Sequence, residues 1–223
     1  MNAVIVRVVE LMRSTMLDSM VPSLPLHRLA LLFALPFVLF TSRQAEGATP
    51  KGTSLRSQAA TLLHWRSSVM YSSERQLGTW RDDVMYPCNW TGITCGATWS
   101  RGGTKVMVIR GIFLGSADVV GRLDNLIFQS LPYLINLDLG DNYHLSGAIP
   151  HGILSLSMLS TLNLSSAQLS GNIPSSICNL GRLTLIDLSF NNLTGQIPPA
   201  LGNLSRLVIL NLGANRLSGD IPW

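Results

Sequence analysis

The amino-acid sequence predicts an α/β solenoid, a right-handed superhelix whose short parallel strands stack coil upon coil on a concave face, and three observations lead to this prediction. First, leucine is concentrated in one part of the chain, where it makes up 25 of the 115 residues from 109 to 223. Second, these leucines recur with a period of 24 or 25 residues. Third, each period carries a second motif built on glycine, usually with isoleucine and proline. One unit of this kind cannot bury its own apolar face, whereas stacked units can.

The strand-forming motif is L-x-x-L-x-L, with isoleucine in place of leucine at some positions. Its last residues alternate apolar and polar, which points one set of side chains inward and predicts a short strand. Successive strands are expected to lie side by side in one parallel sheet. The five copies occupy residues 109–114, 134–139, 159–164, 183–188 and 207–212.

The second motif is L-[S/T]-G-x-I-P. Its glycine gives the turn conformational freedom, its isoleucine returns to the core, and its proline restrains the backbone on the convex side. The first repeat has Val119-Val-Gly-Arg-Leu123 instead and lacks the proline. The four complete copies occupy residues 145–150, 169–174, 193–198 and 217–222.

An asparagine follows three of the strands, at Asn142, Asn191 and Asn215. Its side chain is expected to bond backbone amide groups of neighbouring coils where the chain turns. Ala167 stands at the same place after the 159–164 strand, so the sequence predicts a gap in this ladder of asparagines.

The N-terminal region predicts a secretory signal. Residues 29–40 form an uninterrupted apolar run of 12, which is too short to span a membrane and matches the apolar part of a signal peptide. Ala45 and Gly47 suit cleavage before Ala48. Met20 would be a natural start, because acidic residues lie upstream of it. We therefore expect a signal region at 1–47, an N-terminal cap at 48–108 and about five repeats at 109–223, the last one truncated.

Charge argues against nucleic-acid binding. The formal net charge is +4, but 11 of the 16 Lys and Arg lie in residues 1–108 and no basic run occurs. The repeats carry 5 basic and 6 acidic residues, so their balance is close to neutral. A few solvated charges near the N-terminus explain the high isoelectric point better than a binding stripe does.

Cysteines and glycosylation sequons fit an oxidising, secretory compartment. Cys88 and Cys95 are close in sequence, and Cys178 is left over in the repeats. Bridging the first two would stabilise the protein by about 2–3 kcal/mol on the loop-entropy account. A reactive or metal-binding thiol pair is the alternative, although no ligand stands at a suitable spacing. Four Asn-x-Ser/Thr sequons begin at Asn89, Asn163, Asn192 and Asn203.

The repeats resemble the plant-type extracellular leucine-rich repeat, LxxLxLxxNxLxGxIPxxLGNL. The segment before them, with residues 58–65, Trp80 and the stretch 87–95 (PCNWTGITC), resembles the N-terminal cap of the same family. Residues 54 to 223 together are similar to the start of the ectodomain of plant leucine-rich-repeat receptor kinases and receptor-like proteins. Independently of the family, Leu62, Leu63 and Trp65 can form a short helix that covers the open end of the first coil.

No catalytic motif is present. The four histidines, His27, His64, His144 and His151, form no constellation with a nucleophile and an acid. We therefore expect no enzyme activity, no cofactor and no metal site.

The candidate binding surface is the concave face, where side chains between the inward leucines point outward. A glycan on Asn163 would obstruct part of this face. The candidate contact residues are Phe113, Asp138, Asp141, Asn163, Ser166, Asp187, Phe190 and Asn211.

The resemblance implies an extracellular recognition module that binds a peptide or protein, with a possible co-receptor, in the apoplast or at the outer face of the plasma membrane. In that family the kinase follows a transmembrane helix, so membrane attachment here would need a missing C-terminal segment or an uncleaved signal. One alternative is a secreted inhibitor of a cell-wall hydrolase, of the polygalacturonase-inhibitor type. Another is a truncated, non-functional fragment, since the last repeat stops at Trp223. An uncapped end predicts aggregation of the isolated chain.

Overall fold

The computed structural model describes residues 54–71, 77–81, 86–100 and 102–221. The predicted signal region at 1–47, with His27 and the start at Met20, lies outside the described residues. Within the described part of the chain, no helix is both long and apolar enough to cross a bilayer.

The described part of the chain begins with an α-helix, α1 (Leu55–Ser68), as the sequence predicts for the cap. The Ser54 side chain accepts a hydrogen bond from the Ser57 backbone N–H and so caps the helix N-terminus. Leu62 and Trp65 are spaced by three residues, which puts both on one helical face, and both are fully buried. Leu63 is only partly buried against the same core.

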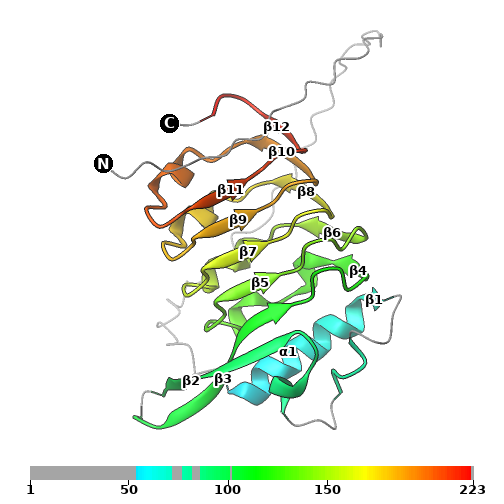
Figure 1. Ribbon diagram of the computed structural model, residues 1–223, viewed down its shortest axis with the longest axis vertical. Helices are drawn as coiled ribbons and strands as arrows, with labels where there is room; N and C mark the ends of the chain where they lie inside the picture. Colours follow the sequence, from blue (N-terminus) through cyan, green and yellow to red (C-terminus); the bar gives the residue numbers. More distant parts are fainter. Residues whose placement is uncertain (1–53, 72–76, 82–85, 101, 222–223) are drawn as a thin grey trace, which may run out of the picture. The chain divides into compact units, whose positions relative to one another are not determined.

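Two six-stranded sheets run along the solenoid (Figure 1). The first sheet consists of β2 (Ile93–Trp99), β3 (Lys105–Phe113), β5 (Asn136–Asp138), β7 (Thr161–Asn163), β9 (Leu185–Asp187) and β11 (Ile209–Asn211). The second consists of β1 (Met70–Tyr71), β4 (Val119–Arg122), β6 (Leu145–Ala148), β8 (Gln168–Asn172), β10 (Asn192–Gln196) and β12 (Arg216–Ser218).

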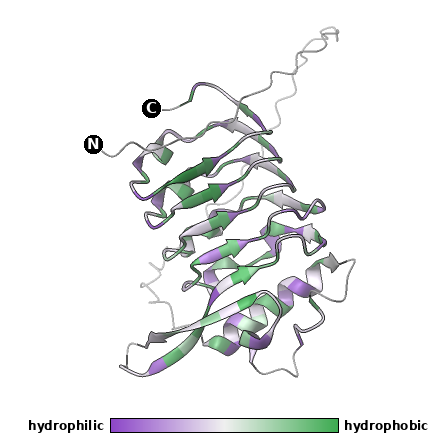
Figure 2. Cartoon of the chain, in the orientation of Figure 1, coloured by the Kyte–Doolittle hydropathy of each residue, from purple (hydrophilic) through white to green (hydrophobic). Residues whose placement is uncertain are grey.

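The first sheet confirms the predicted repeat alignment. Ile112 pairs with Leu137, Leu137 with Leu162, Leu162 with Ile186 and Ile186 with Leu210, all in parallel register. These are the central apolar positions of the five strand motifs, and the first four of them are at most 1% exposed. Figure 2 shows apolar residues concentrated along β9 and β11 of this sheet. Only β2 breaks the pattern, because it pairs antiparallel with β3 and forms a hairpin.

The second sheet is an addition to the prediction, which had one sheet. It is built from the L-[S/T]-G segments, which were expected to turn rather than to pair. Gly147, Gly171 and Gly195 have φ values of 97°, 78° and 76°, a region open mainly to glycine. The strands pair in parallel from β4 to β12, and only β1 is antiparallel.

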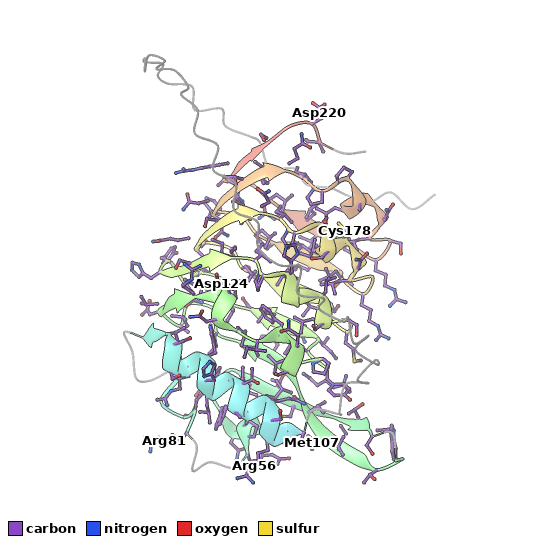
Figure 3. The ribbon with its side chains drawn as sticks, turned by 180° about the vertical axis from the view of Figure 1, so that it is seen from behind. Arg56, Arg81, Met107, Asp124, Cys178 and Asp220 are labelled. Carbon is purple, nitrogen blue, oxygen red and sulfur yellow. A yellow bond between two sulfur atoms is a disulfide. The ribbon has the colours of Figure 1, made fainter. Side chains whose placement is uncertain are left out.

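Short 3₁₀ helices return the chain from the second sheet to the first, and Figure 3 shows them from behind, with Cys178 on η5. Ile153, Ile177 and Leu201 on these helices are buried at 0–5% exposure, so the helices close the third side of the core. The 3₁₀ helices are η1 (Pro87–Asn89), η2 (Leu123–Asn125), η3 (Phe128–Ser130), η4 (His151–Ser155), η5 (Ser175–Asn179) and η6 (Pro199–Asn203).

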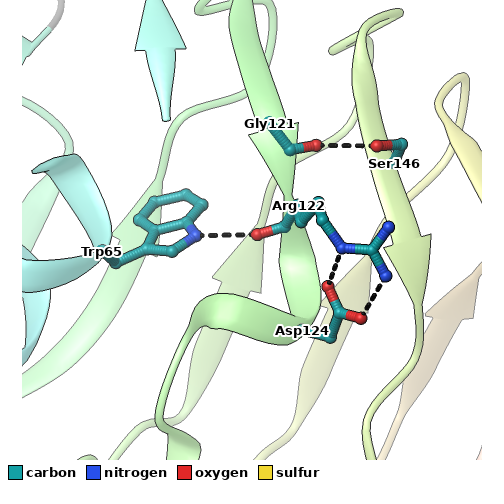
Figure 4. Close-up of polar contacts among 5 residues, drawn as sticks. All are labelled: Trp65, Gly121, Arg122, Asp124 and Ser146. Carbon is teal, nitrogen blue, oxygen red and sulfur yellow. Dashed lines mark hydrogen bonds and ion pairs between the residues drawn. The ribbon is translucent and has the colours of Figure 1, made fainter. Parts of the chain in front are cut away.

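The cap is attached to the first coil by buried polar groups as well as by apolar packing. The Trp65 indole donates to the Arg122 carbonyl oxygen at 3.2 Å (Figure 4). The buried Gln58 side chain accepts a hydrogen bond of 2.8 Å from the Ile109 backbone N–H. Trp80 lies beside Trp65, with ring centroids 6.5 Å apart, and stacks on Trp90 at 5.6 Å. These contacts fix the orientation of α1 against β3 and β4.

Asparagine side chains join successive coils, as predicted; Asn142 and Asn191 are buried and Asn215 is half-buried. The Asn191 amide donates to the carbonyl oxygens of Leu164, Leu188 and Ser189, and its oxygen accepts from the Leu169 N–H at 2.9 Å. Asn142 and Asn215 repeat this pattern with their own neighbours. Each amide therefore satisfies backbone groups of two coils at a turn where strand pairing cannot.

The gap at Ala167 is compensated by an extra residue in the preceding coil. Six positions separate Leu139 from Leu145, whereas five separate Leu164 from Leu169. The longer turn lets the Leu145 N–H donate to the Asn142 carbonyl oxygen at 2.8 Å. This is the N–H that an asparagine at position 167 would otherwise bind. The extra residue that gives this coil its 25-residue spacing therefore lets the backbone make the hydrogen bond that the missing asparagine would have made.

We predict that Asn191→Ala destabilises the protein by about 3 kcal/mol, because it leaves several buried backbone groups unpaired. Ala167→Asn is the matched control. It should bring no stabilisation of comparable size, because the Leu145 N–H already has a partner. Denaturant unfolding of the two variants measures both effects. A gain from Ala167→Asn as large as the loss from Asn191→Ala would contradict the compensation.

Candidate recognition surface

Five side chains form one row across the first sheet, which we call the strand-end row. Each comes from the position between the last two apolar residues of a strand motif, so each points to the outer side of the sheet. The parallel register places them next to one another, as the sequence predicts. The row consists of Phe113, Asp138, Asn163, Asp187 and Asn211.

The polar side chains of the strand-end row are held by hydrogen bonds. Asn163 Nδ2 donates to Asp138 Oδ1 at 2.8 Å, and Asn211 Nδ2 donates to Asp187 Oδ2 at 3.2 Å. Each of the four also accepts from the backbone N–H two residues later. These bonds orient the side chains before any partner arrives, which reduces the entropy lost on binding.

A second row on the same face was missed by the sequence reasoning. It lies two residues before the strand-end row and consists of Gly111, Asn136, Thr161, Leu185 and Ile209. The two-residue period of a strand was the signal that could have identified it. This second row changes character along the solenoid: Asn136 and Thr161 are polar, whereas Leu185 and Ile209 are apolar, and Ile209 is 49% exposed. The surface thus offers polar contacts in its middle and apolar contacts towards β11.

The remaining predicted contacts lie in the turns after the strands. Asp141, Ser166 and Phe190 share a left-handed backbone with φ of 52–55°. This conformation costs a residue with a side chain about 1 kcal/mol, and it suits aspartate better than phenylalanine. Phe190 is nevertheless 64% exposed. The turn therefore presents an aromatic ring to solvent beside the strand-end row.

Arg110 is a cation on β3, at the cap end of the first sheet. Arg110 extends across β2, and its Nη2 donates to the Ala97 carbonyl oxygen at 2.9 Å. A side chain at Gly96 would meet the Arg110 Cγ at 2.9 Å, so this glycine leaves room for the arginine. The guanidinium is consequently held over the hairpin.

The four sequon asparagines differ in their surroundings. Asn89 on η1, Asn192 at the start of β10 and Asn203 at the end of η6 are exposed. Asn163 is partly buried and belongs to the strand-end row. Three sequons therefore lie away from the outer side of the first sheet, and one lies on it.

The two cap cysteines form a disulfide, with Cα atoms 5.4 Å apart, and Cys178 is a free thiol. Burial raises the pKa of Cys178. In the part of the chain that the structure describes, no three His, Cys, Asp or Glu side chains gather at a distance suited to a metal ion.

We predict that Gly140→Ala disturbs the Asp138–Asn163 pair, because the new methyl group would lie 2.6 Å from Asn163 Nδ2. Such overpacking should destabilise the protein by about 1–3 kcal/mol. Gly181→Ala is the matched control, since nothing lies within 4 Å of the added carbon, and its effect should stay within about 1 kcal/mol of zero. Equal stabilities of the two variants in thermal unfolding would refute the packing argument.

We also predict that Cys178 reacts slowly with iodoacetamide. A raised pKa means less thiolate at a given pH, so the rate-against-pH curve should have its midpoint above the value of about 8.5 for a free cysteine. Mass spectrometry of the labelled chain measures the rate. Guanidinium should restore the rate of a cysteine peptide, and native labelling faster than that peptide would contradict the prediction.

Comparisons with known proteins agree with this architecture. The family described as Leucine rich repeat N-terminal domain matches residues 55–96, and the Leucine Rich Repeat family matches residues 158–180 and 182–204. A chain of the BIR3–SERK2 complex from Arabidopsis thaliana is 34% identical, with a TM-score of 0.62, and the match covers 73% of this chain and 84% of that one. This protein belongs to the plant leucine-rich-repeat receptor ectodomains.

Two further relatives extend the comparison. The ectodomain of the Arabidopsis receptor kinase GASSHO1/SCHENGEN3, solved with CASPARIAN STRIP INTEGRITY FACTOR 2, is 32% identical with a TM-score of 0.64. That match covers 74% of this chain but 19% of the other. A receptor-like protein kinase of Arabidopsis is 36% identical over 89 residues, which are 40% of this chain and 8% of that protein. This ectodomain chain thus spans less than a tenth of that curated relative.

Proposed function

We propose that this ectodomain chain is an extracellular recognition module that binds an extended peptide or a protein surface through the outer face of the first sheet. The observation that carries the proposal is the strand-end row, whose polar side chains are fixed by hydrogen bonds yet reachable from solvent. Recognition is the function that such a surface supports, because it offers hydrogen-bond donors and acceptors that are already oriented.

The composition of the face favours a partner with both polar and apolar groups. Asp138, Asp187 and Asp141 supply acceptors, whereas Ile209 and Phe190 supply exposed apolar area. An extended peptide can meet both kinds of group, since it presents a side chain to the sheet at every second residue. Exposed aromatic residues are also enriched among the strongest contacts of protein interfaces.

The related structures support the same kind of partner. The GASSHO1/SCHENGEN3 ectodomain was solved in complex with CASPARIAN STRIP INTEGRITY FACTOR 2, and BIR3 was solved in complex with SERK2. By analogy, we propose a peptide or protein ligand and a co-receptor for this chain. The disulfide, the sequons and the predicted signal region favour a place outside the cell, in the apoplast or at the outer face of the plasma membrane.

The experiment uses the full chain, expressed in plant cells and recovered from the medium. A phage library of random linear peptides is selected on it, and the enriched peptides are synthesised and titrated by calorimetry. We predict that Thr161→Lys weakens their binding at least about tenfold, equivalent to about 1.4 kcal/mol. The reason is that a long charged side chain would cover the middle of the second row.

Gln168→Lys is the matched control for the added charge, because Gln168 is exposed on β8 of the second sheet. Its affinity for the same peptides should be unchanged. Circular dichroism confirms that both variants are folded. Failure to enrich any peptide, or equal affinities of the two variants, would overturn the proposal.

A further inference from the structure

We propose that the folded protein carries N-glycans at Asn89, Asn192 and Asn203 and none at Asn163, so that the outer face of the first sheet stays free of carbohydrate. This inference rests on the proposed secretion and recognition function. It adds which faces of the protein carry glycans and which face remains free to bind a partner. It reverses the expectation that a glycan on Asn163 obstructs that face.

N-glycosylation is a group transfer to the asparagine amide. The bond between sugar C1 and asparagine Nδ2 forms, the C1–O bond to a lipid diphosphate donor of the secretory pathway breaks, and Nδ2 loses one proton. The product therefore places a sugar ring directly on Nδ2. An acceptor that remains glycosylated in the folded state needs an Nδ2 that faces open solvent.

Asn163 does not offer such an Nδ2. Its Nδ2 donates to Asp138 Oδ1 at 2.8 Å, and its Oδ1 accepts from the backbone N–H and the hydroxyl of Ser165, at 3.1 and 2.8 Å. The hydroxyl of Ser165, the third residue of the sequon, is thus also hydrogen-bonded to a member of the strand-end row. These bonds determine the orientation of the amide plane on the sheet.

The Asn163 amide packs closely over Gly140 of the neighbouring coil. A Cβ placed on Gly140 would lie 2.6 Å from Asn163 Nδ2 and 3.0 Å from its Cγ, so the amide is pressed against the backbone of the neighbouring coil. One Nδ2 hydrogen points to the Asp138 carboxylate and the amide lies against Gly140, so a sugar on Nδ2 would crowd both neighbours. Chains glycosylated at Asn163 before folding would lose these contacts, and we expect them to be absent from the folded, secreted protein.

The other three sequons offer the exposed asparagine that Asn163 lacks, although the hydroxyls of Thr91 and Thr194 are hydrogen-bonded as well. Asn89, Asn192 and Asn203 are exposed, and no side-chain hydrogen bond holds any of them among the described residues. Asn192 belongs to the second sheet, Asn203 to the 3₁₀ helices and Asn89 to the cap. Glycans at these places would cover the parts of the ectodomain other than the strand-end row.

The glycan positions therefore indicate how a partner can approach. A peptide or protein can contact Asp138, Asn163 and Asp187 directly, with the sugars on other faces. Asn163 is then a contact residue rather than a carbohydrate anchor.

The test maps glycans on the full chain secreted by plant cells. The protein is digested, deglycosylated enzymatically in oxygen-18 water and analysed by mass spectrometry, so that each glycan-bearing asparagine becomes a labelled aspartate. We expect complete conversion at positions 89, 192 and 203, and an unmodified asparagine at position 163. A glycan at Asn163, or an unmodified asparagine at any of the other three, overturns the inference.

Sequon variants give an independent measurement. Thr194→Ala and Ser205→Ala should each lower the intact mass by one glycan, whereas Ser165→Ala should leave the glycan number unchanged. Loss of a glycan in Ser165→Ala overturns the inference, as does an unchanged glycan number in either of the other two. The result is separable from peptide binding: a protein that binds no peptide can still show this glycan pattern, and a binding-competent protein with a glycan at Asn163 refutes only the pattern.

Discussion

The buried asparagine amide is the interaction on which the solenoid depends. Stacked leucines supply the apolar core, but a turn between the two sheets leaves backbone groups that no strand can pair. Asn191 binds three carbonyl oxygens and one N–H, drawn from two successive coils. A single side chain thereby links two coils and holds the path of the turn. Where the asparagine is missing, at Ala167, the extra residue before Leu145 supplies the bond from within the backbone. Every buried backbone N–H and C=O group in these turns thus needs a hydrogen-bond partner, and in most coils the asparagine side chain provides it.

The candidate recognition surface follows from the same coil-to-coil step. Parallel register brings one residue of each coil into line, so Asp138 meets Asn163 and Asp187 meets Asn211. A carboxylate beside an amide gives a bonded pair, whereas two neighbouring carboxylates would repel each other. Hydrogen bonds between neighbouring side chains therefore hold the strand-end row in place, in addition to the pairing of the strands that carry it. Phe190 differs, because it stands in a left-handed turn after the strand and most of its ring is exposed.

The cap shows how a solenoid end can be closed. Trp65, Trp80 and Trp90 form a continuous aromatic cluster, and Gln58 supplies an acceptor for the backbone of the first strand. The disulfide between Cys88 and Cys95 ties η1 to β2 beside this cluster. Side chains from outside the repeats therefore both cover the apolar end of the core and provide hydrogen-bond partners for the backbone of the first strand.

The sequence alone determined the period, the identity of the core leucines, the asparagine ladder with its gap, the cap helix and the strand-end row. These features depend on spacing along one chain, and a 24-residue step with two-residue alternation specifies them. Only the tertiary structure decided the second sheet, the substitute bond at Leu145, the second row with Leu185 and Ile209, and the enclosure of Asn163. Each of these depends on which atoms of different coils come within hydrogen-bond or van der Waals distance. Such distances are determined by how the coils stack. The sequence around Gly140 or Asn163 does not indicate that these two residues are in contact.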